Sequence, residues 1–260
     1  LNEDGSLIPE RVKMTSDDEI ITVADTPDFT YTANTKENVI YKAVGKSVVD
    51  DYTWNVYVDG AEQAGDDLAP ANDKDTDYAY TAKGATTEIY VDDDTNDVTI
   101  VTVRTYVFQA ASDYDTRKET VSLTTDSSKY DTDITLDSRT LDVDDFANIT
   151  DLKADDYVLV TAVNNNSRYE VKSIDKAEVV NGTVEGYKDG SNVTMGGTKY
   201  EYSKNYTDAV KDDSNLSYDL NDAYTLVLDA NGYVIYTDGT AGHNDYVYVA
   251  EIAPTGGAKA

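Results

Sequence analysis

Apolar and polar residues alternate along most of the chain with a period of two, which is the pattern of strands that bury one face. The clearest alternating segments are 54–58, 99–103 and 199–202. Helical periodicity is confined to two short segments, 66–71 and 144–151. Dipeptides that favour tight turns separate the alternating segments: Asp59-Gly60, Asn181-Gly182, Asp189-Gly190, Gly196-Gly197, Asn231-Gly232 and Asp238-Gly239. The pattern predicts an all-β fold with little helix.

One β-hairpin pattern recurs along the chain. The segment 152–175 contains a strand that passes through Tyr157, a polar turn and a returning strand, and 220–238 repeats these parts in the same order around Tyr224. A weaker copy covers 87–103, and the strands that follow each hairpin also match in order. Because a repeated segment of this kind is one supersecondary unit, the chain is expected to consist of units packed in series.

These repeats predict tandem small β-barrels or β-sandwiches. Each unit would have about five or six short strands, which is enough for a small barrel or sandwich. Units of this size are marginally stable alone, so we expect neighbours to pack together. The expected division is an upstream segment at 1–37, β units at 38–103, 104–175 and 176–240, and a linker with the start of a further unit at 241–260.

Charge and composition limit the partners and the cellular location that the sequence is compatible with. The formal net charge is -30, which would repel phosphate backbones and anionic membranes, so no nucleic-acid partner is expected. No apolar run approaches the roughly 20 residues that span a bilayer. The absence of Cys excludes disulfides, thiol nucleophiles and Cys-ligated metals. Abundant Asp and Tyr fit a loop-rich β protein, and with no Cys they favour an extracellular bacterial protein.

A halophilic cytosolic protein is the competing interpretation of the acidic composition. We expect halophilic proteins to be poor in Lys, whereas here 16 Lys stand against 5 Arg. The first nine residues lack the basic start and the apolar stretch of a signal peptide. The chain begins at Leu1 and ends in Gly-Gly-Ala-Lys-Ala, so we expect it to be a segment of a longer protein.

The strands and turns over 156–184, 197–202 and 224–236 are similar to β-rich regions of S-layer homology domain-containing surface proteins of Gram-positive gut bacteria. The acidic turn at 92–97 resembles the acidic hairpin turns of those regions, and the resemblance extends over roughly 80–252. The wall-binding S-layer homology modules themselves are not visible in this sequence. The resemblance implies a secreted, surface-displayed structural or stalk region.

Calcium is the ion that the acidic turns favour, because it takes six to eight oxygen ligands from carboxylates, carbonyls and water. Asp92, Asp94, Asn96 and Asp97 place such oxygens on one short turn. The turn is not an EF-hand loop, since the sixth position is Asp97 instead of Gly and the twelfth is Val103 instead of Glu. The alternative interpretation is that these are solvated turn residues. No other cofactor is expected.

Other candidate chemistry is sparse. Trp54, with Tyr52 and Tyr57 nearby, is the one Trp-centred cluster, which fits either a sugar-binding platform or core packing. The single histidine, His243, lies in a Gly-containing stretch that is typical of a linker. Pairs of carboxylates carry no weight in a chain with 51 acidic residues.

We therefore expect a structural region that is not an enzyme and that presents or spaces other modules on a bacterial cell surface or cell wall. Its partners would be neighbouring modules or copies of the same protein. An adhesin-like module is the alternative, binding a glycan or a host protein through Tyr-rich faces and the loop 203–218. A hydrolase that uses a pair of Asp residues is a remote alternative.

Overall fold

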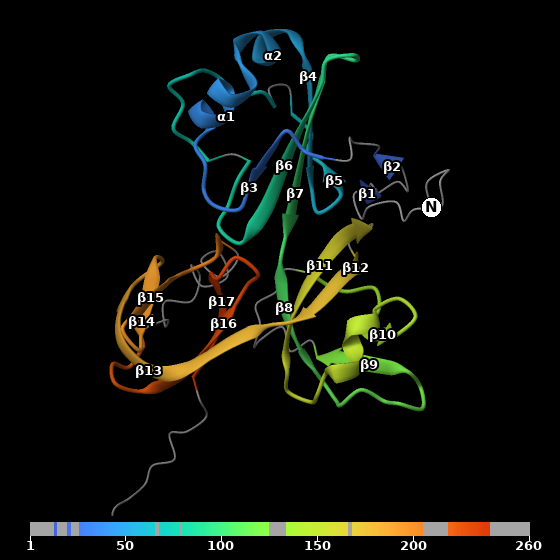
Figure 1. Cartoon of the computed structure of the whole chain (residues 1–260), viewed down its shortest axis with the longest axis vertical. Coiled ribbons are helices and arrows are strands. Elements are labelled where there is room, and N and C mark those ends of the chain that lie inside the picture. The colour runs from blue at the N-terminus through green and yellow to red at the C-terminus, as the bar shows by residue number, and fades with distance from the viewer. Residues whose placement is uncertain are drawn as a thin grey trace, which may run out of the picture.

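The computed structural model describes residues 13–14, 20–21, 26–65, 68–78, 80–124, 134–165, 168–204 and 218–239. Within these ranges the chain forms three five-stranded sheets from successive stretches, and β1 (Lys13–Met14) pairs with β2 (Ile20–Ile21) (Figure 1). Strands dominate over helices, so the predicted all-β class is confirmed. None of the helices in the described ranges is long and apolar enough to cross a membrane.

The first sheet combines a β-α-β crossover with a hairpin. Its strand order is β3 (Phe29–Tyr31), β6 (Ala85–Asp92), β7 (Asp97–Arg104), β4 (Thr53–Val58) and β5 (Ala61–Glu62). The pair β4–β7 is parallel, and the other neighbours are antiparallel. The helices α1 (Glu37–Val44) and α2 (Lys46–Asp51) connect β3 to β4, so β6 and β7 lie between the two strands of the crossover.

The two helices were not predicted, although an apolar stripe marks them. Ile40 and Val44 lie four residues apart on one side of α1, and Val48 lies in α2, after the break at Gly45. All three pack into the first core, which also contains Trp54 and Ile100. Each helix is too short for its periodicity to stand out, and tertiary packing stabilises such short helices.

Of the two helices predicted from the sequence, one is wrong where it is described and the other is present in part. The described residues 68–71 form no helix, so the prediction of a helix at 66–71 is wrong for that part. The second segment, 144–151, contains the 3-10 helix η1 (Ala147–Asp151).

The second sheet is a Greek key extended by one strand. Its order is β10 (Thr140–Asp142), β9 (Thr120–Thr124), β8 (Tyr106–Ala110), β11 (Tyr157–Asn165) and β12 (Arg168–Lys176), all antiparallel. Three consecutive strands are followed by a longer connection through η1 that returns β11 to the side of β8. A parallel bridge between Leu136 and Tyr169 brings the chain before β10 against β12. The sheet therefore curls into a partly open barrel.

The third sheet has the same topology. Its order is β15 (Thr198–Glu201), β14 (Asn192–Met195), β13 (Glu178–Lys188), β16 (Ala223–Leu228) and β17 (Val234–Gly239). A parallel bridge between Tyr202, just after β15, and Val234 links the chain to β17, whereas in the second sheet the bridge to β12 comes from Leu136, before β10. The hairpins predicted within 152–175 and 220–238 correspond to β11–β12 and β16–β17, and these occupy equivalent positions.

The hairpin at 87–103 is also present, as β6–β7, but it belongs to a sheet of different strand order. The prediction that it is a third copy of the same unit is therefore wrong. Residues 29–31, expected in a separate upstream segment, form β3 and pair with β6. How the chain divides into independently folding units stays a prediction.

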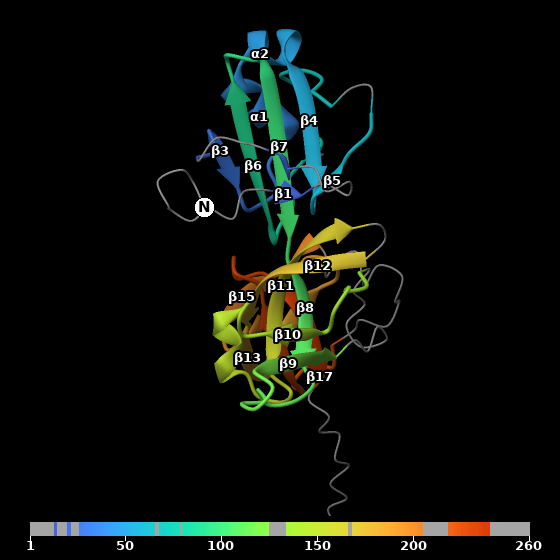
Figure 2. The same cartoon turned by 90° about the vertical axis from the view of Figure 1, so that its right-hand side faces the viewer.

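Each sheet has its own apolar core, and a further apolar cluster joins the second sheet to the third. Along β8, Tyr106 and Phe108 face the second core, whereas Val107 between them faces the third sheet. We call this joining cluster the apolar seam; its buried members are Val107, Leu159, Ala177, Val227 and Ile235. The second and third sheets lie side by side and the first lies at one end of the pair (Figures 1 and 2).

Candidate functional site

The contact between the first and second sheets is built around the buried carboxylate of Asp59. Asp59 lies in the turn after β4 and is 2% exposed. Its Oδ1 accepts a hydrogen bond from the backbone N–H of Arg104 at 2.8 Å, and its Oδ2 accepts from Arg104 Nε at 2.6 Å and from the Tyr106 hydroxyl at 2.7 Å. Asn164 of β11 donates its N–H to the Asp59 carbonyl at 2.8 Å. We call this set the first–second junction.

The ion pair at this junction joins the buried carboxylate of Asp59 to the partly exposed guanidinium of Arg104. Burial raises the pKa of Tyr106, and the charge of Asp59 raises it further, so the hydroxyl stays a donor. Burial acts to lower the pKa of Arg104, but Asp59, together with Tyr106 and Tyr169, outweighs this effect, and the pKa is raised. Both neighbours of Asp59 are therefore held in the protonation states that its carboxylate requires.

A second polar contact joins the first sheet to the third. The loop before β6 brings Lys83 to Glu201 at the end of β15, with 2.6 Å between Nζ and Oε2. Lys204 donates its backbone N–H to the Lys83 carbonyl at 2.9 Å. The hydrogen bond from Lys83 lowers the pKa of Glu201. We call this contact, together with Gly84, Ser203 and Asp229, the first–third junction.

The second and third sheets meet at the apolar seam, and a polar contact lies beside it. The rings of Tyr157 and Tyr236 lie 5.6 Å apart, beside the seam. The Tyr157 hydroxyl donates to Asp238 Oδ2 at 2.7 Å. Each pair among the three sheets therefore shares a specific contact made of buried or half-buried side chains.

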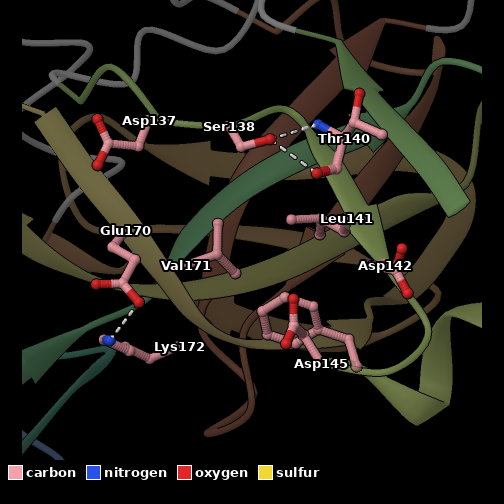
Figure 3. A pocket seen from close by; sticks show the side chains of 10 residues that line it. Asp137, Ser138, Thr140, Leu141, Asp142, Asp145, Glu170, Val171 and Lys172 are labelled. Atoms are coloured by element: carbon pink, nitrogen blue, oxygen red, sulfur yellow. Dashed lines mark hydrogen bonds and ion pairs between the residues drawn. The ribbon is translucent and has the colours of Figure 1, made fainter.

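A pocket of about 420 Å³ opens between β10 and β12, the two edge strands of the second sheet (Figure 3). Leu141, Val171 and Phe146 supply its apolar lining. Its remaining lining is polar: Asp137, Ser138, Thr140, Asp142, Asp145, Glu170 and Lys172. Lys172 pairs with Glu170 at 2.6 Å, so the remaining carboxylates leave the rim negative. Its volume is within the range of small-molecule sites, about 300–1,000 Å³.

The residues predicted to bind calcium lie on the turn between β6 and β7. Asp92 Oδ1 accepts the backbone N–H of Thr95 at 3.1 Å and of Asp94 at 2.9 Å, and these hydrogen bonds lower the pKa of Asp92. Asn96 has a φ of 58°, and Asp97 pairs with Asp92 to begin β7. Residues 92–96 are exposed, and Asp97 is half-buried.

Across the described ranges, no group of three or more His, Cys, Asp or Glu side chains is placed to hold a metal ion. The acidic side chain of Asp92 organises its own turn instead, as Asp does in many turns. The calcium site therefore stays a prediction.

The other predicted candidates have mixed outcomes. Trp54 is 8% exposed and belongs to the first core, so the interpretation as core packing is confirmed over that of a sugar platform. The Tyr52 hydroxyl donates to Asp93 at 2.7 Å. His243 and most of the loop 203–218 lie outside the described residues.

Sequence reasoning did not single out Asp59, Asp229 or the pocket. Asp59 and Asp229 stand in ordinary turn signals, Asp59-Gly60 and Asp229-Ala230-Asn231-Gly232, which predict exposed turns. The pocket depends on how two edge strands curl toward each other, and no local pattern encodes this.

No protein-family model matches the chain, and no curated protein matches it. Among solved structures, drosophila Unr CSD456 is similar over 54% of this chain and 63% of that chain, at 13% identity and a TM-score of 0.21. This chain thus spans less than two thirds of that chain's length. A TM-score this low supports no conclusion about fold or function.

Proposed function

We propose that this chain is a structural spacer in a secreted bacterial cell-surface protein of the S-layer type, holding neighbouring modules at a set distance. The main support for this proposal is that successive sheets are connected by linkers of a single residue and are held together by buried contacts. Thr105 alone separates β7 from β8, and Ala177 alone separates β12 from β13.

Connections this short leave little room for independent motion. Domains joined through small interfaces and flexible linkers move relative to one another by default. Here Ala177 is itself buried in the apolar seam, and Arg104, next to Thr105, is held by the carboxylate of Asp59. The three sheets are therefore coupled into one body, which is the property that a spacer needs.

The surface charge supports the same proposal. With 51 acidic residues against 21 basic residues, copies of the chain repel one another at close range. A large net charge also keeps a protein soluble when it is displayed at high density. Divalent cations would relieve part of this repulsion, and calcium is the cation that the turn at 92–97 favours.

Small-angle X-ray scattering tests the coupling of the sheets. The wild-type chain should scatter as one body, and inserting a short Gly-Ser segment after Thr105 should increase the radius of gyration because the junction contacts separate. A matched insertion in the exposed turn at Asp189-Gly190 should leave the arrangement of the sheets unchanged. If the wild type already scatters as independently moving parts, the spacer proposal fails.

Two further measurements test location and calcium. An antibody against this region should label intact cells of the source bacterium; labelling only after lysis contradicts a surface location. Millimolar calcium should raise the melting temperature, and a chelator should reverse the rise. The variant Asp92→Asn with Asp94→Asn should respond less, whereas a wild type indifferent to calcium refutes the calcium site.

The pocket favours a binding module as a second candidate. Its volume is in the range of ligand sites, and its lining, with Leu141, Phe146 and Val171 among seven polar or charged residues, suits a polar ligand such as a glycan. A glycan array and a panel of host surface proteins would identify binders, and Phe146→Ala should weaken them while Val179→Ala, an exposed site in β13, should not. Binders that tolerate Phe146→Ala bind elsewhere, and an absence of binders removes this candidate.

A further inference from the structure

Asp229 is a buried carboxylate with one oxygen that has no partner. It follows β16 and is 4% exposed. Its Oδ1 accepts the backbone N–H groups of Asn231 at 2.9 Å and Tyr233 at 3.0 Å, which shape the turn to β17. Its Oδ2 is buried and accepts no hydrogen bond from any residue in the described ranges.

The unpaired oxygen faces the first sheet. A Cβ placed on Gly84 would lie 2.4 Å from Asp229 Oδ2 and 2.9 Å from Ser203 Cβ. Gly84 also has a φ of 83°, a conformation that favours glycine. The backbone of the first sheet's loop therefore closes directly over the carboxylate of the third sheet.

In the described ranges, the segments that meet at this oxygen carry four charged or titratable groups. The loop before β6 contributes Lys83, the chain at and just after the end of β15 contributes Glu201 and Lys204, and Asp229's own turn contributes Tyr233. The Lys83 ammonium pairs with Glu201 and lies 6.0 Å from the centre of the Tyr233 ring. None of these four groups donates a hydrogen bond to Oδ2.

We propose that Asp229 makes the first–third junction proton-sensitive: the junction is strengthened when this carboxyl is protonated and weakened when it is ionised. A charge buried without a partner is costly, whereas a neutral carboxyl in the same place is much less so. The protonation state of Asp229 should change the stability of the contact in which Lys83 and Gly84 pack over Ser203 and Asp229.

The burial of Asp229 decides whether the stability of the folded chain rises or falls with pH. Burial raises the pKa of Asp229 above 3.8, although the backbone donors of Tyr233, Asn231 and Gly232 act to lower it. The folded chain therefore binds this proton at a pH where the unfolded chain does not. The added stability is complete below about pH 3.8 and is lost as the pH rises through the raised pKa.

The variant Asp229→Asn isolates this effect. Asn keeps an oxygen for the two turn hydrogen bonds and resembles the protonated acid in shape and charge. At neutral pH its melting temperature should exceed that of the wild type by about 2–4 °C. The gap should close as the pH falls to about 4. Because self-repulsion among the other acids changes equally in both proteins, it cancels in the comparison.

Asp189→Asn, in the exposed turn after β13, is the matched control and should show no such gap. Hydrogen exchange gives a local readout, since the Lys204 N–H bonds to the Lys83 carbonyl across the junction. This amide should exchange several-fold more slowly in Asp229→Asn than in the wild type at neutral pH, and equally at low pH.

Three outcomes would overturn the proposal. Identical pH profiles for the wild type and Asp229→Asn would mean that the carboxyl does not titrate across the relevant range. An Asp229→Asn chain that is less stable at every pH would mean that the charge itself is required. Calcium stabilisation at neutral pH that Asp229→Asn abolishes would assign the oxygen to a cation instead of a proton.

Discussion

Replacing Asp59 with Asn tests whether the first–second junction is held by a charge. Asn tolerates the positive φ of 48° at this position and keeps an oxygen for the Arg104 backbone N–H. It removes the negative charge that accepts from Arg104 Nε and from the Tyr106 hydroxyl. The backbone and side-chain volume stay nearly unchanged, so the variant reports on the ion pair and its hydrogen bonds.

The expected loss follows from the burial of each partner. A hydrogen bond to a charged group contributes about 1.5–3 kcal/mol. The Arg104 side chain is 38% exposed, so water offsets part of its loss, and we assign that pair about 1 kcal/mol. The Tyr106 residue is 6% exposed, and its weakened hydrogen bond adds about 1–2 kcal/mol. Together the free energy of unfolding should fall by about 2–3 kcal/mol.

Urea denaturation followed by two probes measures this loss. The only tryptophan, Trp54, lies in the first core, so its fluorescence reports the first sheet, while circular dichroism reports all three. In the wild type the two transitions should coincide because the sheets are coupled. In Asp59→Asn the fluorescence transition should move to lower urea and separate from the circular dichroism transition.

A double-mutant cycle with Tyr106→Phe assigns the effect to the contact. The coupling energy between the two positions should be about 1 kcal/mol, because the hydroxyl and the carboxylate are 2.7 Å apart. A loss below about 0.5 kcal/mol, the range of neutral surface substitutions, would refute the assignment of this carboxylate as the main polar contact of the junction. Zero coupling would place the stabilisation in other contacts of Asp59.

Two further substitutions, each with a matched control, and one acid titration test other contacts of the structure. Val227→Ala should cost about 2 kcal/mol in urea denaturation because it leaves a cavity in the apolar seam, whereas Val179→Ala, 42% exposed, should cost under about 0.5 kcal/mol. Gly84→Ala should lower the melting temperature more than Gly196→Ala, since both glycines have positive φ but only a Cβ at Gly84 meets other atoms; equal effects would mean that the junction yields freely. In acid titration followed by carbon NMR, Asp92 should protonate below its ordinary pKa of 3.8, and the hairpin should lose stability as the pH falls through that lowered value; a normal midpoint would show that its turn hydrogen bonds do not persist in solution.

Much of the local structure was readable from the chain. The alternation at 54–58 and 99–103 predicts β4 and β7, and four of the six turn signals connect paired strands. The other two predicted turns are wrong, because Asn181-Gly182 lies inside β13 and Asp238-Gly239 ends β17. The recurrence of the pattern around Tyr157 and Tyr224 anticipates two sheets of one topology. These features are predictable because hairpin pairing and period-two burial depend on residues close together in sequence.

The parallel pairing of β4 with β7 was not readable, because the two strands are far apart in sequence and the crossover places a hairpin between β3 and β4. The helices α1 and α2 were missed for a related reason. Their apolar residues stabilise a helix only once Ile40 and Val48 can pack against Trp54.

The sequence by itself determined the strand content, the hairpins and the acidic coat of this protein. Tertiary structure alone decided which Asp residues matter. Asp59, Asp189 and Asp229 all begin short turns, yet Asp189 is exposed while Asp59 and Asp229 are buried beneath another sheet. A turn motif specifies backbone geometry, but desolvation of a carboxylate depends on what packs over it, and that is set by contacts between segments far apart in the chain.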